Sequence, residues 1–259
     1  MIHSSSVISK EAEIAPGVTV GPFCVIRGKV KIGKGTVLHN SVTIGGDCGE
    51  VEIGENNQFF ACSVIGGPPQ DLKYKGETTK LIVGNNNIIR ECVTLNLGTV
   101  TGSGVTKVGN GNLIMAYAHL GHDCQIGNNN ALANCCQMAG HVIFEDNIHV
   151  GGNCGFIQFT RVGKFAYIGA QSTINKDILP FSIAQGNYAT CRATNKIGLD
   201  RAGFSKEQVA NIHKAIRSII LGSLTLNEAI SKIEAECELD DNIQSIIEFV
   251  NAAEKGIAR

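Results

Sequence analysis

Three histidines and one aspartate come close together when the chain is counted in steps of six residues. They are His119, His122, Asp123 and His141. An imidazole can take up a proton near neutral pH, and a neighbouring carboxylate can orient the ring and stabilise the imidazolium that forms. The adjacent pair His122 and Asp123 is therefore a candidate general base with its orienting carboxylate.

A glycine lies 18 positions after His122, and a glutamine lies 18 positions further on; they are Gly140 and Gln158. If residues 18 apart stack on one another, the Gly140 backbone N–H lies one coil from the His122 imidazole. A backbone N–H in that place can stabilise the oxyanion of a tetrahedral intermediate, which acyl transfer requires in addition to a base. The alternative for His122 is an exposed polar residue without a chemical role.

A repeat of six residues must hold these side chains. An apolar residue recurs at every sixth position in four runs, which span 8–44, 53–65, 83–95 and 108–174. Glycine often follows it, which indicates a short strand and then a tight corner. Strand side chains alternate, so the residue two positions earlier should also point inward. These residues are small: Cys24, Ala118, Cys124, Cys136, Cys154, Thr160, Ala166 and Ser172.

Three such steps make a triangular coil of 18 residues, and stacked coils should be about 4.8 Å apart. His119 and His122 lie off the apolar positions, so we expect both on the outside of the coil. The repeat is interrupted at 66–82, which preserves its phase, and at 98–107, which shifts it by one residue. These segments are expected to be loops, and loops on a rigid scaffold often carry binding residues.

Helical signals replace the repeat after Gln185. Ser205 with Gln208, and Thr225 with Glu228, have the spacing of capping boxes. We therefore expect a mainly β protein with a β-helix domain over 1–186 and a small helical domain over 187–259. The helices would cover the open end of the solenoid.

Composition excludes several classes of protein. The formal charge of −1 shows no basic excess of the kind that marks a nucleic-acid-binding protein. No apolar run is long enough for a transmembrane helix, and residues 1–10 do not resemble a signal peptide. The ten cysteines include no C-x-x-C pair, which favours free thiols in a reducing compartment. A cytoplasmic protein is expected.

Longer motifs carry a family resemblance. The six-residue spacing resembles the left-handed parallel β-helix of the hexapeptide-repeat acyltransferases. Within that class the chain resembles the bacterial acyl-[acyl-carrier-protein]–UDP-N-acetylglucosamine O-acyltransferases, and the similarity covers essentially the whole chain. The motifs are PQDLKYKGE at 69–77, AHLGHDC at 118–124, AGHV at 139–142, AQGN at 184–187 and GLDRAGF at 198–204.

The resemblance implies transfer of an (R)-3-hydroxyacyl group from acyl carrier protein to the 3-hydroxyl of UDP-N-acetylglucosamine. This is the first step of lipid A synthesis, and it implies no metal or other cofactor. His122 would be the general base and Asp123 would orient it. The Gly140 N–H would be the oxyanion donor.

The resemblance also implies a set of substrate-binding residues. Asp71 would accept a hydrogen bond from the 3-hydroxyl of the acyl group, with Gln70 and Lys73 of the same loop beside it. Ala170, where the family has glycine, would shorten the acyl pocket. The residues expected to contact the sugar nucleotide or the acyl donor are His119, His141, Gln158, Asn195 and Arg201.

Members of this class are usually homotrimers with sites between subunits, and a homotrimer is expected here. Residues 192–217 hold six basic side chains against two acidic ones, which suits an acidic carrier protein but also an ordinary solvated helix face. Two other functions stay open. One is a zinc site made by His119, His122 and His141, as in β-helix carbonic anhydrases. The other is a repeat scaffold that only binds a partner.

Overall fold

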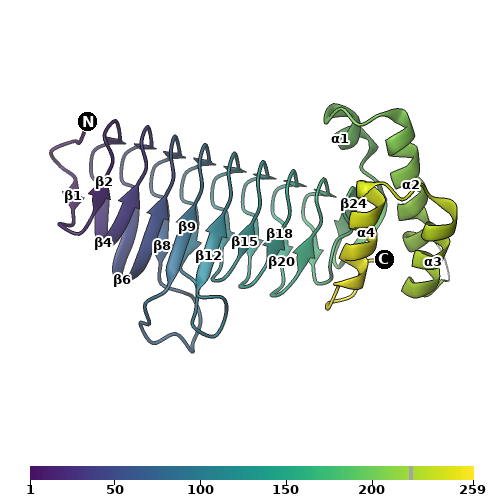
Figure 1. Ribbon diagram of the computed structural model, residues 1–259. Coiled ribbons are helices and arrows are strands. Elements are labelled where there is room, and N and C mark those ends of the chain that lie inside the picture. The colour runs from purple at the N-terminus through teal and green to yellow at the C-terminus, as the bar shows by residue number, and fades with distance from the viewer. Residues whose placement is uncertain (222–223) are drawn as a thin grey trace.

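The chain winds into a parallel β-helix with three faces, and four helices cover its C-terminal end (Figure 1). The computed structural model describes residues 1–221 and 224–259. The N-terminus lies at the opposite end of the solenoid from the helices.

One face is a sheet of ten strands, here called the β16 face. All neighbouring strands in it are parallel, except that the last strand returns antiparallel to the one before it. The strands are β3 (Thr19–Val20), β5 (Val37–Leu38), β7 (Gln58–Phe59), β10 (Ile88–Ile89), β13 (Leu113–Ile114), β16 (Ala131–Leu132), β19 (His149–Val150), β22 (Tyr167–Ile168), β24 (Ser182–Gly186) and β25 (Ala189–Thr194).

The other two faces form one sheet of 15 strands, because two long strands run over both of them. These are β4 (Val25–Ile32) and β6 (Thr43–Ile53). Beside their first halves lies the β14 face, with β1 (Val7–Ile8), β8 (Val64–Gly67), β11 (Thr94–Asn96), β14 (His119–Leu120), β17 (Gln137–Met138), β20 (Gly155–Phe156) and β23 (Thr173–Ile174). Beside their second halves lies the β15 face, with β2 (Glu13–Ile14), β9 (Lys80–Val83), β12 (Val105–Val108), β15 (Gln125–Ile126), β18 (Ile143–Phe144) and β21 (Arg161–Val162).

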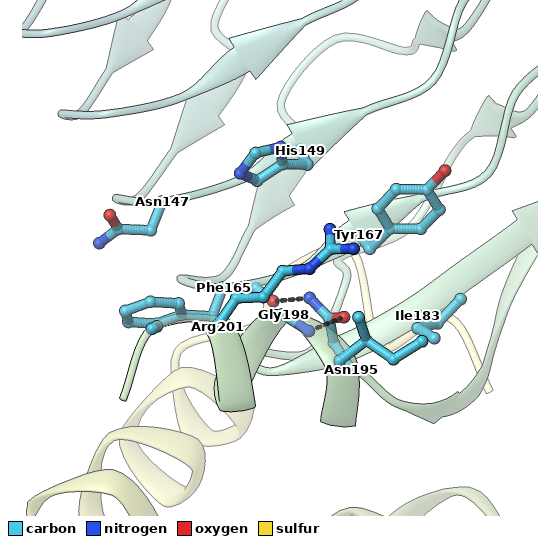
Figure 2. A pocket seen from close by; sticks show the side chains of 10 residues that line it. Asn147, His149, Phe165, Tyr167, Ile183, Asn195, Gly198 and Arg201 are labelled. Carbon is cyan, nitrogen blue, oxygen red and sulfur yellow. Dashed lines mark hydrogen bonds between the residues drawn. The ribbon is translucent and has the colours of Figure 1, made fainter. Parts of the chain in front are cut away.

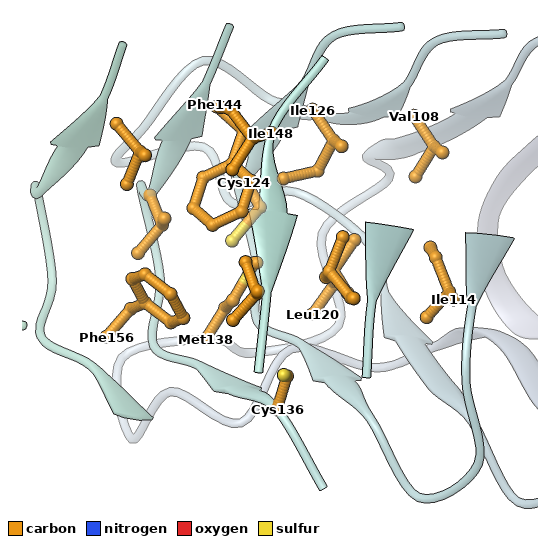
Figure 3. Packing of buried hydrophobic residues seen from close by; sticks show 14 of the residues in the cluster. Val108, Ile114, Leu120, Cys124, Ile126, Cys136, Met138, Phe144, Ile148 and Phe156 are labelled. Carbon is orange, nitrogen blue, oxygen red and sulfur yellow. The ribbon is translucent and has the colours of Figure 1, made fainter. Parts of the chain in front are cut away.

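The six-residue apolar positions form the core, as the sequence predicts. Leu120 pairs with Met138, and Met138 pairs with Phe156, so residues 18 apart do stack. Figure 3 shows these side chains lined up inside the coils together with Cys124 and Cys136. Burial raises the pKa of both thiols to about 12. These cysteines therefore act as small apolar groups.

Two loops leave the coils where the repeat is interrupted, and both project from the solenoid (Figure 1). The first leaves between β8 and β9 and the second between β11 and β12. Val83 pairs with Ile53 on one side and with Val108 on the other. The 25 positions from Val83 to Val108 are one coil plus seven residues, which confirms the predicted shift by one residue.

Four helices follow β25: α1 (Lys196–Arg201), α2 (Lys206–Ile220), α3 (Leu226–Glu236) and α4 (Asp241–Asn251). Both predicted capping boxes are present, at Ser205 for α2 and at Thr225 for α3. The predicted domain boundary lies between 186 and 187. The strand β25 follows this position and pairs with β24 of the solenoid, so the boundary stays a prediction. Within 1–221 and 224–259, no helix is both long and apolar enough to cross a bilayer.

Candidate active site

The corner after β14 carries His122 and Asp123. Asp123 has a φ of 60°, and its backbone N–H donates a hydrogen bond to Thr106 Oγ1 at 2.8 Å. His122 lies outside the apolar core, as expected, but only 5% of it is exposed. A histidine that is buried at a corner, rather than solvated, has an environment fixed by its neighbours.

The predicted column through this corner is present. The backbone N–H of His141 donates to the carbonyl of His122 at 2.9 Å, which stacks one corner on the next. A Cβ added at Gly140 would lie 2.6 Å from His122 Nε2. Because only glycine leaves that space, the Gly140 backbone can come directly against the imidazole.

His122 and Asp123 are hydrogen-bonded to each other. The distance from His122 Nδ1 to Asp123 Oδ2 is 2.9 Å, and the Asp123 side chain is 1% exposed. The carboxylate therefore fixes Nδ1 as the protonated nitrogen and leaves Nε2 as the basic one.

The loop between β11 and β12 covers the Asp123 carboxylate with donors. The backbone N–H of Thr99 lies 3.1 Å from both oxygens, and the Thr99 hydroxyl donates to Oδ2 at 2.6 Å. The sequence predicted the loop but gave no indication of Thr99, because the repeat gives no register for residues that leave the coil. The only signal was the interruption itself.

The surroundings lower the pKa of Asp123 and also the pKa values of His119 and His141. Burial acts to raise the pKa of Asp123, but hydrogen bonds from Thr99 and His122 outweigh it and hold this pKa below its usual value. Burial lowers the pKa of His119, and the charge of His122 adds to that effect. Burial also lowers the pKa of His141, against the opposing effect of Asp123. The site therefore favours an ionised aspartate beside two neutral histidines.

A groove of about 450 Å³ runs along the β14 face beside this corner. Its floor is formed by the outward residues of β17 and β20. It brings together five residues that the sequence predicts for the site: Gln70, His119, His122, Gly140 and Gln158. The His119 ring is held there by Thr94, whose hydroxyl lies 2.7 Å from His119 Nδ1.

His141 lies on the other side of the corner, in a second groove of about 420 Å³ that Asp123 and Phe159 also line. Its ring stacks on Phe159 with centroids 4.4 Å apart and meets the His122 ring edge-on at 5.0 Å. Asp71 is close enough for its charge to act on the pKa of His141. His141 and His122 thus adjoin Asp123 from different grooves.

Asn195 and Arg201 line a separate pocket of about 390 Å³ between the β16 face and α1 (Figure 2). Asn195 Oδ1 accepts a hydrogen bond from Gly198 N–H at 3.1 Å and caps α1, while its Nδ2 donates to the Phe165 carbonyl at 2.9 Å. His149 and Tyr167 also line this pocket, and the sequence did not point to either. Within one chain, Asn195 and Arg201 do not line the same groove as His122.

The two remaining predicted residues are exposed. Lys73 lies in the loop between β8 and β9, where its backbone N–H donates to Asp71 Oδ1 at 2.9 Å. Ala170 follows β22, and the backbone of Gly151 approaches it from the preceding coil. Neither side chain contributes to the groove beside His122 within one chain.

Two family models match the chain. One describes bacterial transferase hexapeptide repeats and matches residues 11–46 and 99–140. The other describes domain 2 of UDP-N-acetylglucosamine O-acyltransferase and matches residues 177–258.

Relatives that match over their full length are also named UDP-N-acetylglucosamine O-acyltransferases. The acyl-[acyl-carrier-protein]–UDP-N-acetylglucosamine O-acyltransferase of Thermodesulfovibrio yellowstonii is 45% identical over 258 residues, which cover 100% of this chain and 99% of the relative. That of Anaeromyxobacter dehalogenans is 39% identical over the same coverage. The chain belongs to this family.

Solved structures of UDP-N-acetylglucosamine O-acyltransferases have the same fold. The one from Moraxella catarrhalis gives a TM-score of 0.96 at 37% identity and covers 100% of this chain and 99% of that one. The one from Francisella novicida gives 0.95 at 38% identity, with 100% and 94% covered. These matches confirm the predicted left-handed parallel β-helix followed by C-terminal helices, and the family confirms the prediction of an acyltransferase.

Proposed function

We propose that this acyltransferase moves an (R)-3-hydroxyacyl group from acyl carrier protein to the 3-hydroxyl of UDP-N-acetylglucosamine, the first step of lipid A synthesis. The names of its relatives support this donor and this acceptor. The observation that carries the mechanism is the His122 imidazole, held by Asp123 and packed against the Gly140 backbone in a groove.

His122 is the general base of the proposed reaction. Its Nε2 removes the proton of the sugar 3-hydroxyl while that oxygen attacks the thioester carbonyl carbon. Asp123 stabilises the resulting imidazolium through the 2.9 Å bond to Nδ1. When the tetrahedral intermediate collapses, the carbon–sulfur bond breaks and the leaving thiolate takes the proton from the imidazolium.

The Gly140 N–H is the proposed oxyanion donor. Its neighbours Ala139 and His141 donate their N–H groups to backbone carbonyls, at 3.1 Å and 2.9 Å. Among the residues that the structure describes, the Gly140 N–H has no acceptor. It is therefore free to bind the negative charge that develops beside His122.

The loop between β8 and β9 is proposed to bind the acyl group of the donor. Asp71 accepts a hydrogen bond from the acyl 3-hydroxyl, Lys73 assists it, and Gln70 lines the groove. Gln158, together with His119 and His141, contacts the sugar nucleotide or the acyl chain. Ala170 limits the depth of the acyl pocket.

A second copy of the chain is proposed to complete the site. Asn195 and Arg201 lie in a pocket on the β16 face, whereas His122 faces the groove on the β14 face. In a homotrimer, one copy can place its β16 face opposite the β14 face of the next, because contacts in a closed ring are head-to-tail. Arg201 and Asn195 would then bind the substrate of the neighbouring copy, and the basic residues over 192–217 would bind an acidic carrier protein. A cytoplasmic location is part of this proposal.

Turnover of the purified protein with UDP-N-acetylglucosamine and a panel of (R)-3-hydroxyacyl carrier proteins tests the reaction. His122→Ala should lower kcat by roughly 10²- to 10⁴-fold, the usual contribution of a general base. His3→Ala, at an exposed histidine near the N-terminus, is the matched control and should keep full activity. Full turnover by His122→Ala would contradict the mechanism and favour a scaffold without catalysis.

A zinc site is the second candidate, because His122, Asp123 and His141 offer ligand atoms within 4.8 Å of one another. His119, which the sequence suggested as a third ligand, is instead hydrogen-bonded to Thr94. Zinc content of the purified protein separates the two functions. About one zinc per chain, lost in both His122→Ala and His141→Ala, would favour the metal site.

A further inference from the structure

The Asp123 carboxylate has two histidines within reach of one oxygen. Its Oδ2 lies 2.9 Å from His122 Nδ1 and 3.9 Å from His141 Nε2. A small rotation of the carboxylate would therefore exchange one partner for the other. Only the first pairing holds the proton of His122 on Nδ1 and so keeps Nε2 free to act as a base, which makes the choice of partner important for the proposed mechanism.

The Thr99 hydroxyl lies where it can hold Asp123 Oδ2 toward His122. It donates to the same Oδ2 at 2.6 Å, and Thr99 is 2% exposed. Because its one proton goes to Asp123, Thr99 Oγ1 accepts from the Thr101 hydroxyl, which lies 3.2 Å away. The Thr99 backbone N–H lies 3.1 Å from both carboxylate oxygens and adds a second point of attachment. Two points of attachment fix the plane of the carboxylate as well as its position.

We infer that Thr99 is a positioning residue that directs Asp123 to His122 and away from His141. The inference rests on the proposed role of His122 as the base. With the carboxylate plane fixed, His122 keeps its proton on Nδ1, and its Nε2 stays unprotonated toward the groove. Without the hydroxyl, Oδ2 can turn toward His141, and His122 then populates both tautomers. This gives the interruption of the repeat a chemical role, since its loop carries the Thr99 hydroxyl.

Ser103 provides an internal comparison, because its hydroxyl approaches the same carboxylate from the same loop. It lies 3.3 Å from Asp123 Oδ1 but 2.9 Å from the Val105 carbonyl. A hydroxyl has one proton, and the nearer acceptor is the carbonyl. Ser103 also contacts Oδ1, the oxygen that does not bind His122. Its removal should therefore change catalysis little.

The test compares Thr99→Val, Thr99→Ser, Ser103→Ala and His122→Ala in the full-length protein. Valine has nearly the shape of threonine and keeps the backbone N–H, so only the hydroxyl is lost. We expect Thr99→Val to lower kcat by about 10- to 100-fold, the cost of a misplaced catalytic group, with KM almost unchanged. Thr99→Ser should restore kcat, and Ser103→Ala should resemble the wild type.

The histidine tautomers give a readout that a purely structural role would not move. ¹⁵N NMR of the imidazoles should show the Nδ1–H form of His122 in the wild type and in Thr99→Ser, and a mixture in Thr99→Val. Wild-type kcat in Thr99→Val would overturn the inference. So would a loss of kcat with an unchanged His122 tautomer.

Thermal unfolding shows which variants are folded, and Thr99→Ala replaces the valine variant if valine prevents folding. The same kcat loss and tautomer mixture are expected for alanine, and their absence would overturn the inference. A different result is expected if the proposed role of His122 as the base is wrong. In that case His122→Ala itself retains turnover, whatever Thr99 does.

Discussion

The groove beside His122 and the pocket beside Asn195 lie on different faces of one β-helix and are built in different ways. In the groove, His122, Gly140 and Gln158 occupy one corner in three successive coils, so their positions follow from the repeat. In the pocket, Asn195 joins the start of α1 to the Phe165 carbonyl, and no repeat relates the two. The regular part of the molecule thus holds the proposed chemistry, and the irregular end holds a proposed binding pocket.

This difference has a functional consequence. A periodic scaffold can place a base and an oxyanion donor at a fixed distance, because adjacent coils are about 4.8 Å apart. It presents only one wall, however, and the groove along the β14 face is open. In the proposed trimer, the pocket at the helical end of a neighbouring copy would form a second wall.

The largest effect on kcat is expected for a substitution in the repeating part of the molecule, in the groove beside His122. Gly140→Ala would put a Cβ 2.6 Å from His122 Nε2 and 2.9 Å from Nδ1. Either the imidazole or the oxyanion donor must move, and the expected loss in kcat is roughly 10²- to 10³-fold. Gly46→Ala is the control, because a Cβ there meets nothing within 4 Å and Gly46 does not line the groove beside His122. Equal activity of the two variants would show that the column does not hold the reacting groups.

Mixed oligomers test whether the two regions work across copies. His122→Ala and Arg201→Glu should each be nearly inactive alone. After unfolding and refolding together in equal amounts, about one quarter of the sites in a head-to-tail trimer should combine an intact His122 with an intact Arg201. Steady-state assays measure that recovery, and light scattering measures the oligomeric state. If mixed trimers form but show no recovered activity, His122 and Arg201 do not act together across two copies.

A smaller effect should appear in stability at the irregular end. Asn195→Ala removes the cap of α1 and the bond to the Phe165 carbonyl, which should cost about 1–2 kcal/mol of unfolding free energy. Ser205→Ala removes the comparable cap of α2 and should cost about 1 kcal/mol. Urea unfolding measures both. An unchanged stability with a raised KM in Asn195→Ala would mean that Asn195 serves the substrate and not the fold.

The smallest effect is the pH dependence of the Asp123 contribution. The folded-state pKa of Asp123 is below its ordinary value of 3.8. Its contribution to stability is therefore fully present above about pH 4 and is lost as the pH falls through the folded pKa. The stability difference between wild type and Asp123→Asn should be constant from pH 7 down to about pH 4 and then shrink in acid. A difference that grows in acid would contradict the lowered pKa.

Much of the fold followed from the spacing of apolar residues, because a coil of constant length converts sequence distance into position. The same count of 18 residues correctly predicted that Gly140 lies against His122, and capping-box spacing predicted the starts of α2 and α3. The spacing also indicated that His119 and His122 lie off the core. It did not indicate that His122 is buried, since that depends on what covers the corner.

The sequence by itself determined the period, the core positions and the column through His122, since each of these depends on contacts that recur at a fixed separation. Only the tertiary structure decided that the Thr99 hydroxyl lies on Asp123 and that Asn195 and Arg201 face a different pocket. Those contacts are made by segments that leave the repeat. Their positions depend on how each loop or helix packs back onto the coils, and no period in the sequence encodes that packing.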